Sequence, residues 1–223
     1  TGSSGTTART RMDGGGAMTA SEHVPGGMID RAELIDRQAV HRASSSVTGM
    51  VLLVASEAVF FAAFLGIDAV SFTAAKVWPP AGIETPSITV PTIGVAVLAV
   101  SGVAMALAMR HARRRQYRRG ALLGWLAATL ALAVAFGVLT AIGYADLPFS
   151  VGQGIYESLF YMIIGLELAH VVGGAVLLGL VMTRTWTGEL ALRRDPIQAA
   201  AIYWYFVVVL GIVIYLVLYL AGA

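Results

Sequence analysis

The sequence predicts an all-α membrane protein with five transmembrane helices. Of the 223 residues, 57% are hydrophobic and only 13% are charged, with a mean hydropathy of +0.77. A soluble globular domain carries about 25% charged residues. The apolar residues also gather in five runs, each long enough for the roughly 20 residues that a helix needs to cross a bilayer.

The chain ahead of the first apolar run has a different composition. Residues 1–27 are rich in Gly, Ser and Thr and show no apolar periodicity, so we expect a disordered N-terminal tail. Residues 28–48 combine apolar residues at helical spacing with charges of both signs, which predicts a short amphipathic cytoplasmic segment. The transmembrane domain is then expected over residues 49–223.

Each predicted transmembrane helix is separated from the next by residues that end a membrane-embedded helix. Several prolines between the first and second runs prevent a continuous helix there. A run of arginines separates the second from the third. The five helices are predicted over Gly49–Phe72, Ile88–Met109, Ala121–Ile142, Ile155–Met182 and Ala199–Leu220.

The distribution of basic residues predicts the orientation of these helices. Of the 15 Lys and Arg residues, only Lys76 lies outside residues 1–48 and the second and fourth interhelical segments. The positive-inside rule therefore places the N-terminus and residues 110–119 in the cytoplasm and the C-terminus outside. The arginine cluster could also be a patch for nucleic acid or anionic lipid. A topology anchor is the simpler interpretation, so we expect no nucleic-acid partner.

The composition also excludes several kinds of chemistry. The chain has no cysteine, so disulfides, thiolate catalysis, iron–sulfur clusters and cysteine zinc sites are excluded. Only His170 of the four histidines lies within an apolar run, so we expect no haem or copper bound by this chain. One histidine and scattered acids do not supply the three or four converging ligands of a metal site.

Three ionisable residues lie deep within the predicted helices: Glu57, Glu167 and His170. An ionised carboxylate at that depth costs roughly 2.5–3.5 kcal/mol. The calculated depths of Glu57 and His170 differ by only about 5 Å, so the two side chains can pair. Such a pair could be a structural hydrogen bond between helices, or Glu57 could titrate and assist proton movement. Asp68 and Glu157 lie near the outer helix ends, where we expect water to reach them.

A phenylalanine cluster follows Glu57 on the first predicted helix. Phe60, Phe61 and Phe64 lie three, four and seven residues after it, so they are expected on the same helix face. There they would line a packed groove or one filled with lipid.

Four sequence motifs resemble those of subunit III of the haem–copper cytochrome c oxidases. SEAVFFAAF begins at Ser56, and GLELAHVVGG and AIYWYFVVVLGIVIY lie in the last two predicted helices. The outer-loop motif WPPAGI contributes Trp78, Pro79, Pro80 and Gly82. The resemblance covers approximately residues 45–223, and five helices are typical of the short bacterial members.

The sequence departs from the family pattern at several polar positions. Glu167 replaces the first histidine of the G-F-H-G-L-H motif, while His170 keeps the second. In the last helix, Tyr205, Val208 and Gly211 stand where the family has His, Asp and Trp. The polar roles that carry over from the resemblance are therefore limited to Glu57 and His170.

The resemblance implies a non-catalytic accessory subunit of a bacterial terminal oxidase in the inner membrane. Such a subunit packs with oxidase subunits I and II, holds structural phospholipid, and supports assembly and proton uptake. Haem and copper are expected in the partner subunits. The alternatives are a related subunit of a quinol oxidase or nitric-oxide reductase complex, and a small transporter that uses Glu57, Glu167 and His170 as a proton relay. The sequence shows no inverted repeat, which argues against the transporter.

Overall fold

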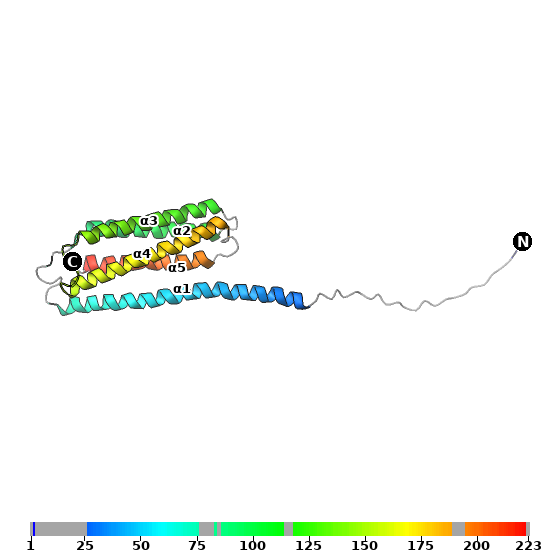
Figure 1. The fold of residues 1–223 in the computed structure, drawn as a ribbon, viewed down its shortest axis with the longest axis horizontal. Coiled ribbons are helices and arrows are strands. Elements are labelled where there is room, and N and C mark those ends of the chain that lie inside the picture. The colour runs from blue at the N-terminus through cyan, green and yellow to red at the C-terminus, as the bar shows by residue number, and fades with distance from the viewer. Residues whose placement is uncertain are drawn as a thin grey trace. The chain divides into compact units, whose positions relative to one another are not determined.

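The computed structural model describes residues 2, 26–75, 83, 86–113, 118–188 and 195–221. The regular structure of these residues is entirely helical (Figure 1). The elements are α1 (Gly26–Ala74), α2 (Thr89–Arg113), α3 (Arg119–Ala145), α4 (Ile155–Thr187), α5 (Asp195–Tyr215) and a terminal π-helical segment, η2 (Leu216–Ala221).

Five of the described helical segments are long and apolar enough to cross a membrane. Four are the full helices α2, α3 and α4 and the segment Asp195–Leu220, and the fifth is the Ser45–Ala74 part of α1. This confirms the predicted fold class. Most helices extend a few residues beyond the predicted apolar runs, because polar residues continue a helix readily once it has left the hydrocarbon. The orientation of the helices across the membrane stays a prediction.

The chain divides into two compact units, Thr1–Ala39 and Val40–Ala223. The predicted boundaries after residues 27 and 48 stay predictions. The candidate site lies entirely within the second unit.

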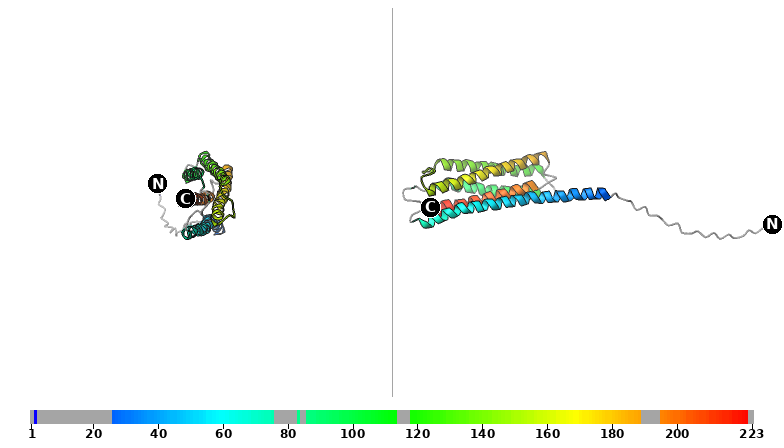
Figure 2. Two further views of the ribbon diagram at one scale, coloured as in Figure 1. Left: turned by 90° about the vertical axis from the view of Figure 1, so that its left-hand side faces the viewer. Right: turned by 60° about the horizontal axis from the view of Figure 1, so that its bottom comes forward.

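The core of the second unit is formed by α2, α3, α4 and α5. Figures 1 and 2 show these four helices side by side, and α2 and α4 each pack against both α3 and α5. In the most apolar 18-residue stretch of Asp195–Leu220, 50% of the residues are buried within the chain. In the corresponding stretch of Ser45–Ala74, only 6% are buried. The α1 segment of this unit therefore leaves most of its apolar surface uncovered by the chain itself.

Trp204 of α5 is the largest fully buried side chain of this core. Its indole Nε1–H donates to Ser101 Oγ of α2 at 3.1 Å, and Ser101 donates in turn to the Leu98 carbonyl oxygen at 2.5 Å. A Cβ atom at Gly174 of α4 would lie only 2.7 Å from Trp204 Cζ3. The indole thus fills space left by a glycine and has its polar group satisfied, as buried tryptophans usually require.

Two tyrosines hold the short connection between α3 and α4. Tyr144 donates its hydroxyl hydrogen to the Tyr161 carbonyl oxygen at 2.7 Å, and Tyr161 donates to the Phe149 carbonyl oxygen at 2.9 Å. The Tyr144 and Tyr161 rings also meet edge to face, with centroids 4.7 Å apart. These contacts fix the first turns of α4, on which the buried Glu157 lies.

Candidate functional site at the α1–α4 contact

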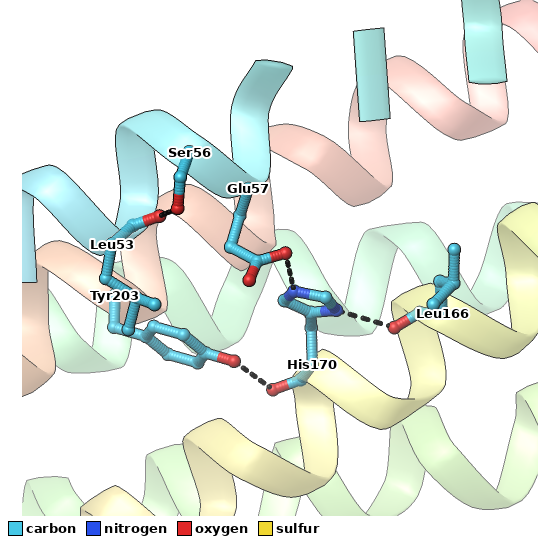
Figure 3. Close-up of polar contacts among 6 residues, drawn as sticks. All are labelled: Leu53, Ser56, Glu57, Leu166, His170 and Tyr203. Atoms are coloured by element: carbon cyan, nitrogen blue, oxygen red, sulfur yellow. Dashed lines mark hydrogen bonds and ion pairs between the residues drawn. The ribbon is translucent and has the colours of Figure 1, made fainter. Parts of the chain in front are cut away.

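The central polar contact of the second unit joins Glu57 on α1 to His170 on α4. Glu57 Oε2 lies 3.1 Å from His170 Nε2 (Figure 3). The structure therefore brings together the two side chains whose calculated depths nearly coincide. A constant helix rise places the two residues at similar depth, and the packing of α1 on α4 turns their side chains toward each other.

The second ring nitrogen of His170 determines what this contact can do. His170 Nδ1 lies 2.7 Å from the carbonyl oxygen of Leu166, an acceptor, so Nδ1 carries a hydrogen and donates it. Nε2 then either accepts a hydrogen bond from a protonated Glu57 or, in the imidazolium form, donates one to a Glu57 carboxylate. The two forms differ only in the position of one proton between Glu57 and His170.

Aromatic rings from two further directions hold the imidazole in place. The Phe61 ring of α1 meets it edge to face with centroids 5.1 Å apart, and the Tyr203 ring of α5 stacks on it with an interplanar angle of 12°. Tyr203 also donates its hydroxyl hydrogen to the His170 carbonyl oxygen at 3.3 Å (Figure 3). Sequence analysis missed this contribution of Tyr203, because nothing in the pattern of α5 indicated which of its faces meets α4.

The pair lies at the edge of the helix bundle. The Glu57 side chain is 30% exposed and that of His170 is 12% exposed. Both side chains therefore remain accessible to lipid or to a neighbouring subunit.

Glu167 does not join the pair, although it lies one helical turn from His170. Its side chain is only 5% exposed, and its Oε1 atom has no hydrogen-bond partner among the residues that the structure describes. The carboxyl group packs instead against Gly211 of α5. The structure thus separates the edge contact of Glu57 with His170 from the buried carboxyl group of Glu167.

The predicted phenylalanine groove is only partly assembled. Phe61 is fully buried against His170, whereas Phe60 is exposed and contacts Phe64, with ring centroids 5.0 Å apart. Phe60 and Phe64 therefore form the part of this cluster that lipid can reach. The outer-loop residues Trp78, Pro79, Pro80 and Gly82 lie outside the described residues.

Asp68 and Glu157 are buried, contrary to the expectation that water reaches them. Glu157 folds back toward the start of α4, so that a Cβ atom at Gly154 would lie 2.6 Å from Glu157 Oε2. The helix dipole favours a negative charge in this first turn, yet Glu157 Oε2 has no hydrogen-bond partner among the described residues. Both acids act electrostatically on Tyr156, which lies near them in the same buried cluster.

Comparison with known proteins identifies the family to which this fold and these residues belong. Residues 30–223 match the family model described as cytochrome c oxidase subunit III. The chain belongs to the cytochrome c oxidase subunit III family. The resemblance inferred from its motifs is thereby confirmed. A subunit III is one component of a multi-subunit respiratory-chain oxidase, and the chain is accordingly a multi-pass membrane protein of such a complex.

Individual relatives carry the same description. The chain is 33% identical over 182 residues to cytochrome c oxidase subunit 3 of Yarrowia lipolytica, an alignment that covers 78% of this chain and 67% of the relative. It is 33% identical over 183 residues to that of Pan troglodytes, covering 78% and 69%. It is 32% identical over 181 residues to that of Pylaiella littoralis, covering 78% and 66%. The chain thus spans about two thirds of the length of these relatives.

Proposed function

We propose that this subunit III family member is a non-catalytic accessory subunit of a bacterial terminal oxidase in the inner membrane. It packs with oxidase subunits I and II, holds structural phospholipid, and supports assembly and proton uptake by the catalytic subunit. Haem and copper are carried by the partner subunits. The observation that carries the proposal is the contact between Glu57 and His170 at the edge of the bundle.

The first argument concerns α1, which presents an apolar surface to a partner. Its exposed residues include Val51, Leu52, Val59 and Val70. Such a surface can face either lipid or the apolar wall of a larger membrane subunit, because burying it removes no apolar area from water. Packing and hydrogen bonds therefore decide whether the helix associates with a partner. The Glu57–His170 contact holds α1 against α4 and so keeps this surface in place for subunit I.

The second argument concerns the proton held between Glu57 and His170. Because Nδ1 is committed to the Leu166 carbonyl oxygen, only Nε2 and the Glu57 carboxyl group can share that proton. A carboxyl–imidazole pair that remains partly exposed can take up a proton and pass it on without rearranging the helices. This supports a role in tuning proton supply to a neighbouring catalytic subunit, in addition to the structural role.

The third argument concerns lipid. Phe60 is exposed and Phe64 is partly buried one turn further along α1, next to the polar pair. An apolar aromatic surface beside a polar contact suits an acyl chain together with its polar headgroup. We assign the structural phospholipid to this surface.

Purification of the tagged chain from native membranes, followed by an optical spectrum, tests the proposal. We expect haem absorption in the purified complex and none in this chain once it has been separated from its partner subunits. Haem spectra and activity typical of a quinol oxidase or a nitric-oxide reductase would assign the chain to that complex instead. A chain that purifies alone, without haem proteins, and transports protons in vesicles would overturn the accessory role in favour of a transporter.

A further inference from the structure

A small, partly open pocket is lined by residues of α2, α3, α4, α5 and η2, away from the Glu57–His170 contact. Its volume is about 50 Å³. Its lining includes Glu167 and the residues at the ends of the helices where α2 begins and α3 ends. The polar side chains of this lining are Thr140, Tyr144, Glu167, Tyr215 and Tyr219.

Glu167 is the unusual member of this pocket. It is nearly fully buried, and its Oε1 atom finds no hydrogen-bond donor within the described part of the chain. A buried carboxyl oxygen without a partner is unfavourable, and proteins normally satisfy such an atom with a side chain or with water. Here the carboxyl group lines a pocket, so water can reach it where the protein does not.

The absence of a side chain at Gly211 leaves the space in which the Glu167 carboxyl group lies. A Cβ atom at position 211 would overlap the Glu167 carboxyl group and the Leu98 side chain. A larger side chain on α5 would therefore occupy the space that the carboxyl group uses. The acid on α4 and the glycine on α5 form one local arrangement.

The rest of the lining can hold water. A buried water needs roughly 10–15 Å³ and two to four polar partners, so the pocket has room for a few. Tyr215 already shares a hydrogen bond with Thr92 at 2.7 Å, yet a hydroxyl group can both donate and accept. Thr140 and the Tyr219 hydroxyl add further polar positions, and Glu167 acts electrostatically on Tyr219.

We infer that Glu167 and this pocket form a hydrated proton-binding site, distinct from the Glu57–His170 pair. The titratable groups that face Glu167 from its neighbours are Tyr144 of α3, Tyr215 of α5 and Tyr219 of η2. The described lining residues of α2 are apolar or glycine: Val90, Pro91, Gly94 and Val95. Glu167 is therefore the only carboxyl group of the described lining, and water in the pocket solvates its carboxylate form when the proton leaves.

The position of the pocket determines where the proton goes. The lining extends from Glu167 to Tyr144, Leu147 and Tyr219, at the membrane face where α3 ends. The proton accordingly exchanges with that face. This inference does not depend on the accessory role proposed above, since it rests on residues that do not contact Glu57 or His170.

Infrared spectroscopy of the complete complex in its native membranes tests the site. We expect the wild-type complex to show a protonated-carboxyl stretching band that shifts when water is replaced by D₂O and disappears as pH is raised. Glu167→Gln should abolish this band, whereas Glu57→Gln should leave it. An unchanged band in Glu167→Gln, or a Glu167 band that does not shift in D₂O, would overturn the inference.

A second pair of variants tests the water itself and leaves Glu167 in place. Thr140→Leu fills part of the pocket and removes its hydroxyl group, and Val138→Leu places the same new side chain on an exposed face of α3. The Glu167 band should exchange more slowly in Thr140→Leu than in either the wild type or Val138→Leu. Equal exchange rates in all three would rule out the pocket as the route, even if Glu167→Gln failed to assemble.

Discussion

The backbone of Gly211 on α5 lies directly against the Glu167 carboxyl group on α4, with no space between them for a side chain. These are two of the positions at which the sequence departs from the subunit III motif, which has Trp and His there. The two departures are therefore neighbours in space and compensate each other, because the glycine accommodates the acid.

Gly211→Ala should destabilise the complex. The added methyl group must displace the Glu167 carboxyl group and Leu98, and overpacking of this kind typically costs about 1–3 kcal/mol. Thermal unfolding of the purified complex measures the loss. Gly179→Ala on α4 is the matched control, because a Cβ atom there meets nothing within 4 Å. Equal unfolding temperatures for the two variants would contradict the contact.

Glu57→Gln and Glu57→Ala separate the structural role of the Glu57–His170 contact from its proton role. Glutamine can donate its amide N–H to His170 Nε2 and keep the link, whereas alanine removes it at a cost of about 0.6 kcal/mol, the average for a hydrogen bond between membrane helices. If the link is mainly structural, Glu57→Gln retains assembly and turnover, and Glu57→Ala lowers the yield of assembled complex.

The proton role has a different signature in the same variants. Glu57→Gln should then leave haem content intact while lowering turnover most at high pH, where protons are scarce. Ser56→Ala is the control, since the Ser56 hydroxyl group donates to the Leu53 carbonyl oxygen of its own helix at 2.7 Å (Figure 3). Wild-type assembly and turnover in both Glu57 variants would rule out the structural role and the proton role alike.

Ser101→Ala should destabilise the junction of α2 and α5. It leaves the buried Trp204 Nε1–H without its acceptor, and an unsatisfied buried donor costs about 1–3 kcal/mol. The same change in a Trp204→Phe background should cost less, because phenylalanine has no N–H to leave unpaired. Additive losses in this double-mutant cycle, measured by unfolding of the complex, would show that the hydrogen bond contributes nothing.

Single cysteines at opposite ends of α4 should report its orientation. The chain has no native cysteine, and Ser150 and Thr187 are both exposed. The positive-inside rule predicts that a membrane-impermeant thiol reagent applied outside modifies Ser150→Cys and spares Thr187→Cys. Permeabilised cells provide the control for reactivity. Labelling of Thr187→Cys but not of Ser150→Cys would show that the chain has the opposite orientation.

The amino-acid sequence was sufficient to predict the transmembrane helices and to show that Glu57 and His170 lie at similar depths and can pair. Both predictions follow from distances along the chain. A bilayer requires about 20 apolar residues per helix, and a constant rise per residue converts sequence position into depth. The family was also predictable, because its motifs combine unusual residues at characteristic spacing.

The tertiary structure alone decided which face of each helix meets its neighbour. In a soluble helix an apolar stripe marks the buried face, but these helices are apolar all round, so the sequence pattern does not distinguish core from lipid. For that reason Phe61 could not be separated from Phe60, and the contacts of Trp204 with Ser101 and Tyr203 with His170 were not foreseen. The burial of Glu167 against Gly211 depends on the packing of α4 against α5, which brings together residues far apart in the chain.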